Sequence, residues 1–449
     1  MAKIKVGVLG AARGRSMIDV LFSHPEAELV AVCDWFRPLL DSVGEAAEEK
    51  GLKVALYDDF EDFIKCDMDA VVLANFANEH APFAIRLLKA GFHVMSEVLP
   101  CASMAQAVEL IEAVEESGKV YAYAENYSYS TKTFEMWQRY ERGDIGEIMY
   151  AEGEYIHDCT GCWDELTRGE RDHWRNLSYS TFYCTHSIAP ILTITGRRPV
   201  QVVGFETFAP DYAVAVGQAK GCGGIEMITL DNGAIARSLH AEFRREPGNT
   251  SYVLNGTRGT METNRMNDTT MSIYRVEEEK PMQEYTPTQA VAPELAQKFS
   301  GHGGADFYPT HFFLEKILGR PDGDKYSIDV YQAVDMGICG ILAYRSILNG
   351  NIPIAVPDLR DPAQRDAYRN DHACTNPAEA GDQLWPINSK KDFHIPDEVY
   401  DNQKKAWKEK NLKRAEEAAK KAAEDAEKAA KAAEKAALAA ERMKELMAD

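Results

Sequence analysis

The first third of the chain alternates short apolar runs with stretches of helical periodicity. We interpret the apolar runs as buried strands, and they lie at residues 4–9, 29–33, 70–74, 93–96 and 120–124. Residues 103–117 are a predicted helix, because Ser103 and Gln106 have capping-box spacing and Gly118 follows as a stop signal. Short strands that alternate with helices are typical of an α/β fold with a doubly wound parallel sheet, which we expect at residues 1–126.

From about residue 147 the pattern changes, because most predicted strands now follow one another directly. They lie at residues 147–155, 200–205, 225–230, 235–242, 251–255 and 260–262. Short turns such as Asp231-Asn232-Gly233 join several of them, which is typical of antiparallel strands. Two predicted helices follow at residues 307–318 and 327–348. We therefore expect a second α/β domain at residues 127–372, with a mainly antiparallel sheet.

The end of the chain differs in composition from both domains. Residues 373–403 contain several prolines and no clear periodicity, so we interpret them as an irregular linker. Residues 404–449 are almost entirely Ala, Lys and Glu, and they predict a helical extension in which small residues recur at alternating steps of three and four. Two interpretations remain open: an oligomerisation arm, or a single solvated helix that is stabilised by helix propensity and Glu–Lys pairs.

The overall charge restricts the possible partners. The 449 residues include 50 Lys and Arg against 71 Asp and Glu, a net charge of −21, so we expect no nucleic-acid partner. No apolar run reaches about 18 residues, so we also expect no membrane span. The start of the chain lacks the pattern of a signal peptide. Nine Cys residues are few for this length, and we expect reduced thiols in the cytoplasm.

A glycine-rich turn after the first predicted strand is a candidate dinucleotide site. Gly10-Ala11-Ala12-Arg13-Gly14 opens a predicted helix, where small residues let the backbone approach a pyrophosphate closely. It departs from G-x-G-x-x-G, because Ala12 holds the second glycine position and the third glycine comes one residue early. Asp34 ends the second predicted strand, where a carboxylate binds ribose hydroxyls and repels a 2′-phosphate. We therefore predict NAD as the cofactor, although the nearby Arg37 leaves NADP open.

These features resemble the Gfo/Idh/MocA family of NAD(P)-dependent sugar and cyclitol enzymes over about residues 3–360. The shared motifs are the fingerprint at 8–14, AVVLANFANEH at 70–80, AGFHVMSEVLP at 90–100, GDIGE at 143–147 and SYVLNGTRGTME at 251–262. The resemblance implies a Rossmann domain followed by an α/β domain whose large open sheet forms the oligomer interface in many members. It also implies an NAD-dependent enzyme that binds a sugar or glycoside between the domains and works as a homo-oligomer.

Two departures from the family pattern make the sequence more similar to one branch of the family. Many members have Glu-Lys-Pro after the fifth strand, but here Glu97 is followed by Val-Leu-Pro, so that lysine is absent. Many also have an aspartate four residues before a histidine of the second domain. Here Phe182 holds the aspartate position, while His186 remains. The segment Tyr183-Cys184-Thr185-His186 instead resembles the Tyr-Pro-Thr-His segment of the NAD-dependent glycosidase branch, in which the Tyr and the His belong to the active site.

The removal of hydride from a sugar carbinol suggests roles for this pair. The hydroxyl proton needs a base, and without the lysine we predict His186, because an imidazole titrates nearest to neutral pH. Tyr183 either donates a hydrogen bond to the sugar or removes the proton at C2 once C3 has become a ketone. In the second case the C1 substituent leaves, and water adds before the hydride returns. A satisfied buried histidine and a core tyrosine are the structural alternatives.

Other polar residues complete the predicted site. Cofactor contacts are expected at the carboxyl edge of the parallel sheet, from Asn75, His80, Glu97 and Asn126. His80 serves equally well as a helix cap. Substrate contacts are expected in the second domain, from His157, Trp174, Arg175 and His302. Residues 157–162 hold one Cys-x-x-Cys pair and one His, which are too few ligands for a zinc site, so we predict no metal.

The sequence thus predicts an NAD-dependent enzyme that removes hydride from a sugar hydroxyl carbon, which we take to be C3. Glycoside cleavage by oxidation, elimination, water addition and re-reduction is the preferred net reaction. A sugar or glycoside dehydrogenase that releases a 3-oxo product is the alternative. The absent lysine and the long extension also support a third hypothesis, an inactive NAD-binding scaffold.

Overall fold

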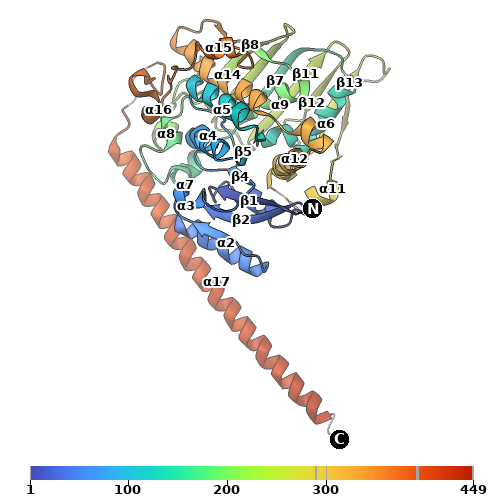
Figure 1. Cartoon of the computed structure of the whole chain (residues 1–449), viewed down its shortest axis with the longest axis vertical. Coiled ribbons are helices and arrows are strands. Elements are labelled where there is room, and N and C mark those ends of the chain that lie inside the picture. The colour runs from blue at the N-terminus through green and yellow to red at the C-terminus, as the bar shows by residue number, and fades with distance from the viewer. Residues whose placement is uncertain (1, 289–290, 300, 391–393, 447–449) are drawn as a thin grey trace.

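The computed structural model describes residues 1–449 apart from 1, 289–290, 300, 391–393 and 447–449, and it contains two domains and a long terminal helix (Figure 1). The first domain holds a six-stranded sheet in the order β3-β2-β1-β4-β5-β6, with all neighbours parallel. Its strands are β1 (Ile4–Leu9), β2 (Ala27–Cys33), β3 (Ala55–Tyr57), β4 (Ala70–Leu73), β5 (His93–Ser96) and β6 (Tyr121–Tyr123). The predicted doubly wound sheet is confirmed, and β3 is added to the five predicted strands.

Helices contribute to two apolar clusters around this sheet. The main ones are α1 (Arg15–Leu21), α2 (Arg37–Glu49), α4 (His80–Lys89) and α5 (Met104–Ser117). The predicted signals mark both ends of α5, because Ser103 Oγ accepts the Gln106 amide at 3.1 Å and Gly118 adopts a φ of 61°. The Gln106 side chain accepts a hydrogen bond from the Ala102 amide rather than from Ser103, so the capping box is shifted by one residue.

A late segment of the chain returns to complete the first domain. Helix α12 (Phe307–Ile317) contacts α1, β5 and β6, and its residues Phe313 and Leu314 are buried in the same apolar cluster as the strands. This return places the residues just before α12 beside the carboxyl edge of the parallel sheet. Side chains more than 180 positions apart in sequence can therefore share one site.

The second domain is built on a nine-stranded sheet in the order β14-β13-β12-β11-β7-β10-β9-β8-β15. The strands are β7 (Ile148–Ile156), β8 (Pro199–Glu206), β9 (Gly223–Leu230), β10 (Ile235–Ala241), β11 (Asn249–Gly256), β12 (Gly259–Thr263), β13 (Met271–Arg275), β14 (Gln283–Tyr285) and β15 (Ile354–Ala355). Every neighbouring pair is antiparallel except β7 and β10, which are parallel. The mainly antiparallel sheet is confirmed. The predicted set lacked β13, β14 and β15.

Two helices cover one face of this sheet. Helix α9 (Thr185–Thr195) packs on β7 and β10, and α14 (Val330–Leu348) packs on β8. Gly153 of β7 permits the close approach of α9, because a Cβ atom there would lie 1.8 Å from the Ser187 carbonyl oxygen. The contact fixes the start of α9, where His186 lies. Met149, Phe205 and Tyr274 are exposed large side chains on strands of the sheet, and its pairing with a second copy stays a prediction.

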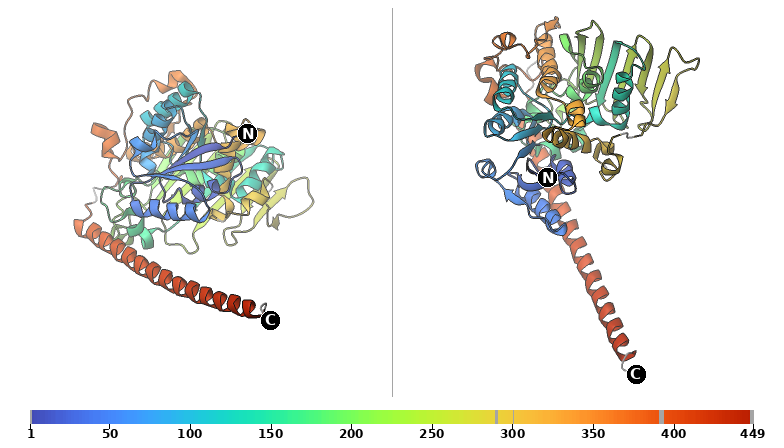
Figure 2. Two further views of the ribbon diagram at one scale, coloured as in Figure 1. Left: turned by 60° about the horizontal axis from the view of Figure 1, so that its bottom comes forward. Right: turned by 45° about the vertical axis from the view of Figure 1, so that its right-hand side comes forward.

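The terminal helix α17 (Asp397–Leu446) begins at Asp397, within the segment that we expected to be a linker. It starts beside the body of the protein and then runs away from it (Figures 1 and 2). Leu412, one of its few large apolar residues, is 63% exposed, so this part of the helix is not packed as a core element. Residues 391–393 of the predicted linker and 447–449 of the extension lie outside the described residues. No helix in the described part of the chain is both long and apolar enough to cross a bilayer.

Candidate active site

A cavity of about 220 Å³ lies between the two domains at the carboxyl edge of the parallel sheet. The first domain contributes the predicted residues Arg13, Glu97 and Asn126 to its wall. The second domain contributes the predicted residues His157, Trp174, Arg175, Tyr183, His186 and His302. The structure therefore brings together predicted residues from both domains and from six separate segments of the chain.

The glycine-rich turn beside this cavity has the backbone geometry that a dinucleotide requires. Gly10 has a φ of 96°, and a Cβ atom there would lie 2.4 Å from the Ala74 backbone. Asp34, which is 9% exposed, accepts hydrogen bonds from the amides of Ala11 (2.7 Å) and Phe36 (2.8 Å). Asn75 Oδ1 is buried and has no hydrogen-bond partner within the described structure. A tight turn, a ribose-type carboxylate and a free amide oxygen fit an NAD molecule at this edge.

Two of the predicted cofactor residues have partners within the protein. Arg37 forms an ion pair with Asp41 at 2.9 Å, and its side chain is 60% exposed. The ring of His80 is buried, and its Nδ1 atom lies 3.0 Å from the Leu99 carbonyl oxygen. Burial lowers the pKa of His80 to about 4, so the ring is neutral and donates a hydrogen bond that holds the loop after Glu97. Its Nε2 atom is buried and has no hydrogen-bond partner among the described residues, so a cofactor contact stays a prediction, whereas the N-cap of α4 is Glu79.

An ion-pair network closes the side of the cavity that faces the glycine-rich turn. Arg13 pairs with Glu97 (2.5 Å) and with Asp306 (2.9 Å). Asp306 also accepts hydrogen bonds from Asn126 (2.9 Å) and His302 (2.8 Å). These donors keep the pKa of Asp306 well below its usual value, whereas burial raises the pKa of Glu97. Asp306, for which the sequence leaves open a place in the pocket wall or a helix cap, precedes α12 and reaches the site through the return of the chain.

His186 forms a buried pair with Glu125, a residue that the sequence analysis missed. Its Nδ1 atom lies 2.7 Å from Glu125 Oε1, and Glu125 is completely buried. The carboxylate oxygen can only accept from the ring, so Nδ1 carries a hydrogen and the neutral ring keeps Nε2 as an acceptor. Glu125 directly follows the predicted strand 120–124, at the sheet edge where ligands bind. This position is the sequence signal that could have identified it as a site residue.

Three tyrosine rings surround the His186 imidazole. The rings of Tyr127, Tyr155 and Tyr183 lie 4.7, 4.8 and 4.9 Å from it. Burial raises the pKa of Tyr183 to about 12, although the nearby Arg175 opposes this shift. At neutral pH Tyr183 is therefore a hydrogen-bond donor and a weak base. Tyr155 has a different partner, because its hydroxyl lies 3.0 Å from Nδ1 of His157.

The outer part of the cavity carries charged and aromatic groups. The Arg175 guanidinium lies 4.5 Å from the centre of the Trp174 ring and 5.7 Å from that of Tyr183. Lys220 and Glu242, which the sequence analysis did not single out, form a buried ion pair at 2.8 Å. One flat aromatic face beside a guanidinium suits a sugar ring with oxygen substituents.

The segment 157–162 is not arranged as a metal centre. Among the described residues, no group of three or more His, Cys, Asp or Glu side chains is placed to hold a metal ion. Cys159 Sγ lies 3.7 Å from His157, and burial raises the pKa of Cys159 to about 12 and also raises that of Cys162. Both thiols are therefore protonated at neutral pH, and the segment serves as part of the cavity wall.

Comparison with protein families identifies the first domain. The family described as "Oxidoreductase family, NAD-binding Rossmann fold" (GFO_IDH_MocA) matches residues 4–125. This range covers the six strands of the parallel sheet and ends at Glu125. The match includes the glycine-rich turn and Asp34, the two features on which the prediction of NAD rested.

Curated relatives and solved structures extend the match into the second domain. A glycosyl hydrolase family 109 protein of Phocaeicola vulgatus is 25% identical over 79% of this chain and 84% of its own length. An alpha-N-acetylgalactosaminidase of Shewanella oneidensis is 24% identical over 80% of this chain and 85% of its own length. A levoglucosan dehydrogenase solved with NADH and levoglucosan has the same fold, with a TM-score of 0.64 and 16% identity over 79% of this chain and all of that one. The chain is therefore an NAD-dependent enzyme whose residues 4–125 match the NAD-binding Rossmann fold of the Gfo/Idh/MocA oxidoreductase family.

Proposed function

We propose that the protein cleaves glycosides by oxidation at C3 of the sugar, elimination of the C1 substituent, addition of water and re-reduction. The observation that carries this proposal is the His186–Glu125 pair on the wall of a cavity that also holds two further proton-transfer groups, Tyr155 and Tyr183. The relatives support it, since two of them are named as a glycosyl hydrolase family 109 protein and an alpha-N-acetylgalactosaminidase. The glycine-rich turn and Asp34 would hold NAD⁺, which would supply the acceptor and later the donor of the hydride.

His186 is the base for the sugar hydroxyl. Nε2 takes the proton of the C3 hydroxyl while the C3–H bond is broken, and the electrons of the O–H bond form the carbonyl. The ring becomes an imidazolium, which the Glu125 carboxylate stabilises at 2.7 Å. In the last step the same Nε2 atom returns its proton to the C3 oxygen. His186 thus ends the cycle in the protonation state in which it began.

Tyr155 is better placed than Tyr183 to remove the C2 proton. A ketone at C3 acidifies the C2–H bond, but a phenol needs a partner that takes its own proton. Burial raises the pKa of both phenols, but Tyr155 has such a partner in His157 at 3.0 Å. The phenolate of Tyr155 takes the C2 proton and the electrons of the C–H bond form a C1–C2 double bond. The C1–O bond then breaks, and its electron pair leaves with the aglycone oxygen. Tyr183 donates a hydrogen bond to a sugar oxygen beside Arg175.

Water then completes the hydrolysis. Its oxygen bonds to C1, and one of its protons passes to the released aglycone oxygen. Tyr155, whose proton has meanwhile exchanged with solvent, protonates C2, and return of the hydride to C3 then leaves no net oxidation. The residues required for each proton transfer thus line one cavity, and no lysine follows Glu97 to take the hydroxyl proton instead. A net dehydrogenase would use only the first half of this sequence and would release a 3-oxo sugar.

A product balance in heavy water tests the proposal. We expect holoenzyme that is incubated with NAD⁺ and aryl glycosides in D₂O to release aglycone without a matching amount of NADH. The free sugar should carry one deuterium at C2, because the C2 proton exchanges with solvent through Tyr155. Matching amounts of NADH and 3-oxo glycoside would instead show a dehydrogenase. Aglycone release without deuterium at C2 would contradict elimination.

The cofactor crevice gives a separate prediction with a matched control. Asp34→Ala is expected to raise the dissociation constant of NAD⁺ about 10–100-fold, because the charged hydrogen bonds to the ribose are lost. It should also reduce the preference for NAD⁺ over NADP⁺. Arg37→Ala is the control, since Arg37 pairs with Asp41 at the surface, and its dissociation constant should stay within about twofold of the original value. Calorimetric titration of both variants measures the effect, and equal losses in the two would refute this assignment.

A further inference from the structure

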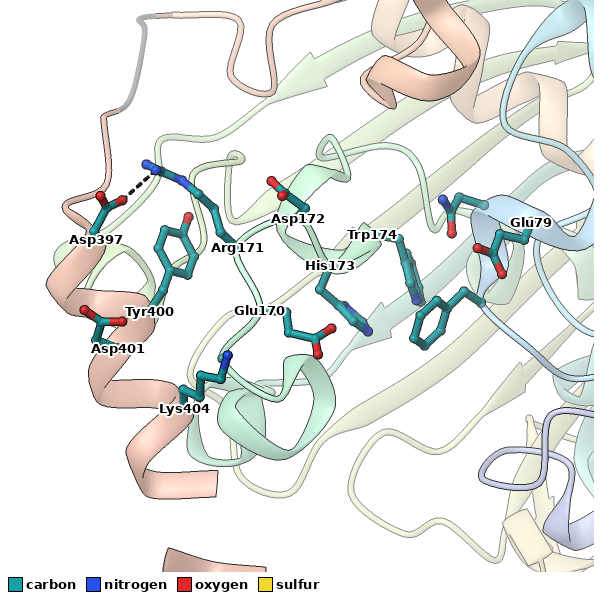
Figure 3. Close-up of a pocket in the computed structure, with 13 residues that line it drawn as sticks. Glu79, Glu170, Arg171, Asp172, His173, Trp174, Asp397, Tyr400, Asp401 and Lys404 are labelled. Atoms are coloured by element: carbon teal, nitrogen blue, oxygen red, sulfur yellow. Dashed lines mark hydrogen bonds and ion pairs between the residues drawn. The ribbon is translucent and has the colours of Figure 1, made fainter. Parts of the chain in front are cut away.

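The first turns of α17 are fastened to a short segment of the second domain, Arg168–His173, and to helix α7 (Trp163–Thr167) before it. Arg171 pairs with Asp397 at 2.5 Å (Figure 3), and Gly169 lies so close to α17 that a Cβ atom there would be 2.2 Å from the Lys404 amide nitrogen. In α7, Asp164 pairs with Lys410 (2.8 Å) and Glu165 pairs with Arg414 (2.6 Å). We call 168–173 the cover segment.

The cover segment reaches the first domain at two points. The Arg168 guanidinium lies 4.3 Å from the centre of the Trp35 ring and 4.7 Å from that of Phe36. At the other end of the segment, the His173 ring lies 4.8 Å from the ring of Phe76. Between these two points the cover segment bridges the two domains across the edge of the parallel sheet.

The two contact points stand on either side of the dinucleotide turn. Trp35 and Phe36 follow Asp34 at the end of β2, and Phe76 follows Asn75 at the end of β4. Strand β1 lies between β2 and β4, and it leads into the glycine-rich turn. The cover segment therefore crosses the carboxyl end of β1 from one side to the other. The adenosine and pyrophosphate part of a dinucleotide binds at this place in a doubly wound sheet.

Arg168 has an unused donor at this crossing. Its Nη1 atom is buried and has no hydrogen-bond partner in the described structure. The neighbouring carboxylates Asp34 and Glu170 favour its charged form, although burial lowers its pKa. A guanidinium that stacks on aromatic rings and keeps a free N–H is suited to a purine face and to ribose or phosphate oxygens.

We propose that Arg168 is a cofactor-binding residue supplied by the second domain, and that the first turns of α17 hold it over the adenosine half of NAD. The dinucleotide then exchanges only when the cover segment separates from Trp35, Phe36 and Phe76. Phe36 also contacts α17 directly, since its ring lies 6.4 Å from that of Trp407. This role uses the part of the helix that touches the body, and it rests on the NAD site rather than on the proposed reaction.

The dissociation rate of NADH from the full-length protein tests this assignment. NADH-loaded protein is mixed with excess NAD⁺, and the loss of bound NADH fluorescence is followed in time. Lys410→Glu/Arg414→Glu is expected to release NADH at least about 10-fold faster, because both ion pairs with α7 become repulsive. Arg168→Ala should do the same. Adding Glu165→Lys to the double variant should slow release again, since it restores one pair.

A matched control separates this effect from a general change of charge. Lys408→Glu/Lys413→Glu makes the same charge change on exposed positions of α17, and its release rate should stay within about twofold of the original. Circular dichroism verifies that each variant unfolds at a temperature close to that of the original protein. Release at the original rate in Arg168→Ala or in Lys410→Glu/Arg414→Glu would overturn the proposal. Because the measurement needs no sugar, it tests the role of Arg168 independently of the net reaction.

Discussion

His186→Ala is expected to lower the turnover number about 10²–10⁴-fold while the affinity for NAD⁺ stays unchanged. The imidazole takes and returns the hydroxyl proton, and no lysine follows Glu97 to replace it. The neighbouring tyrosines do not replace it, since burial raises the pKa of Tyr183 to about 12, and Tyr155 with its partner His157 is assigned to the C2 proton. Aglycone release under saturating substrate measures the loss, and fluorescence titration with NAD⁺ measures cofactor binding.

Chemical rescue distinguishes a base from a structural residue in this variant. Removal of the ring leaves space beside Tyr127 and Tyr155, and free imidazole of the same shape can enter it. We expect added imidazole to restore part of the activity in proportion to its unprotonated fraction. A variant that keeps more than about a tenth of the original turnover would show that another group takes the proton. Loss of NAD⁺ affinity together with activity would point to a structural role.

Local patterns predicted most of the parallel sheet because its strands are buried and bounded by clear turns. β1 and β5 have the predicted bounds, and Ser103 and Gly118 mark α5. β3 was missed, because its three residues are only partly buried and give a weak apolar signal. The parallel pairing of β7 with β10 could not be predicted either, since the apolar pattern of a strand does not indicate which strand it pairs with. The start of α17 was placed too late, because its first turns are not rich in alanine.

The candidate site shows the same division between local and long-range information. His186 and Asp34 were predicted because each stands in a short motif with a chemical meaning. Glu125 was missed and the role of Asp306 was left open, because their partners lie 61 and 293 positions away along the chain. Arg37 was included for its position near Asp34, but it turns to Asp41 one helical turn ahead. Residue type and spacing thus identify the reacting groups, whereas the residues that position them require the fold.

Glu125→Gln is expected to lower the turnover number about 10²–10⁴-fold, although it removes no group that touches the sugar. The carboxylate accepts a hydrogen from Nδ1 of His186 at 2.7 Å. A glutamine that donates its amide hydrogen to Nδ1 would force the proton onto Nε2, which then could not act as a base. It would also leave the imidazolium without its countercharge. A change of carboxylate to amide at a buried position outside the cavity should have no such effect, and Glu226→Gln in the second domain is the control.

Glu226 is a suitable control because it is completely buried, and burial raises its pKa to about 8, so the carboxyl is mostly neutral at pH 7. An amide of the same shape should leave turnover within about twofold of the original. The pH profile separates a positioning role from a merely structural one. If Glu125 sets the tautomer of His186, Glu125→Gln should lose turnover across the whole pH range while the melting temperature and the NAD⁺ affinity remain close to those of the original protein. If instead Glu125 only supports the fold, the melting temperature should fall with the activity, and the role assigned here to the His186–Glu125 pair would be wrong.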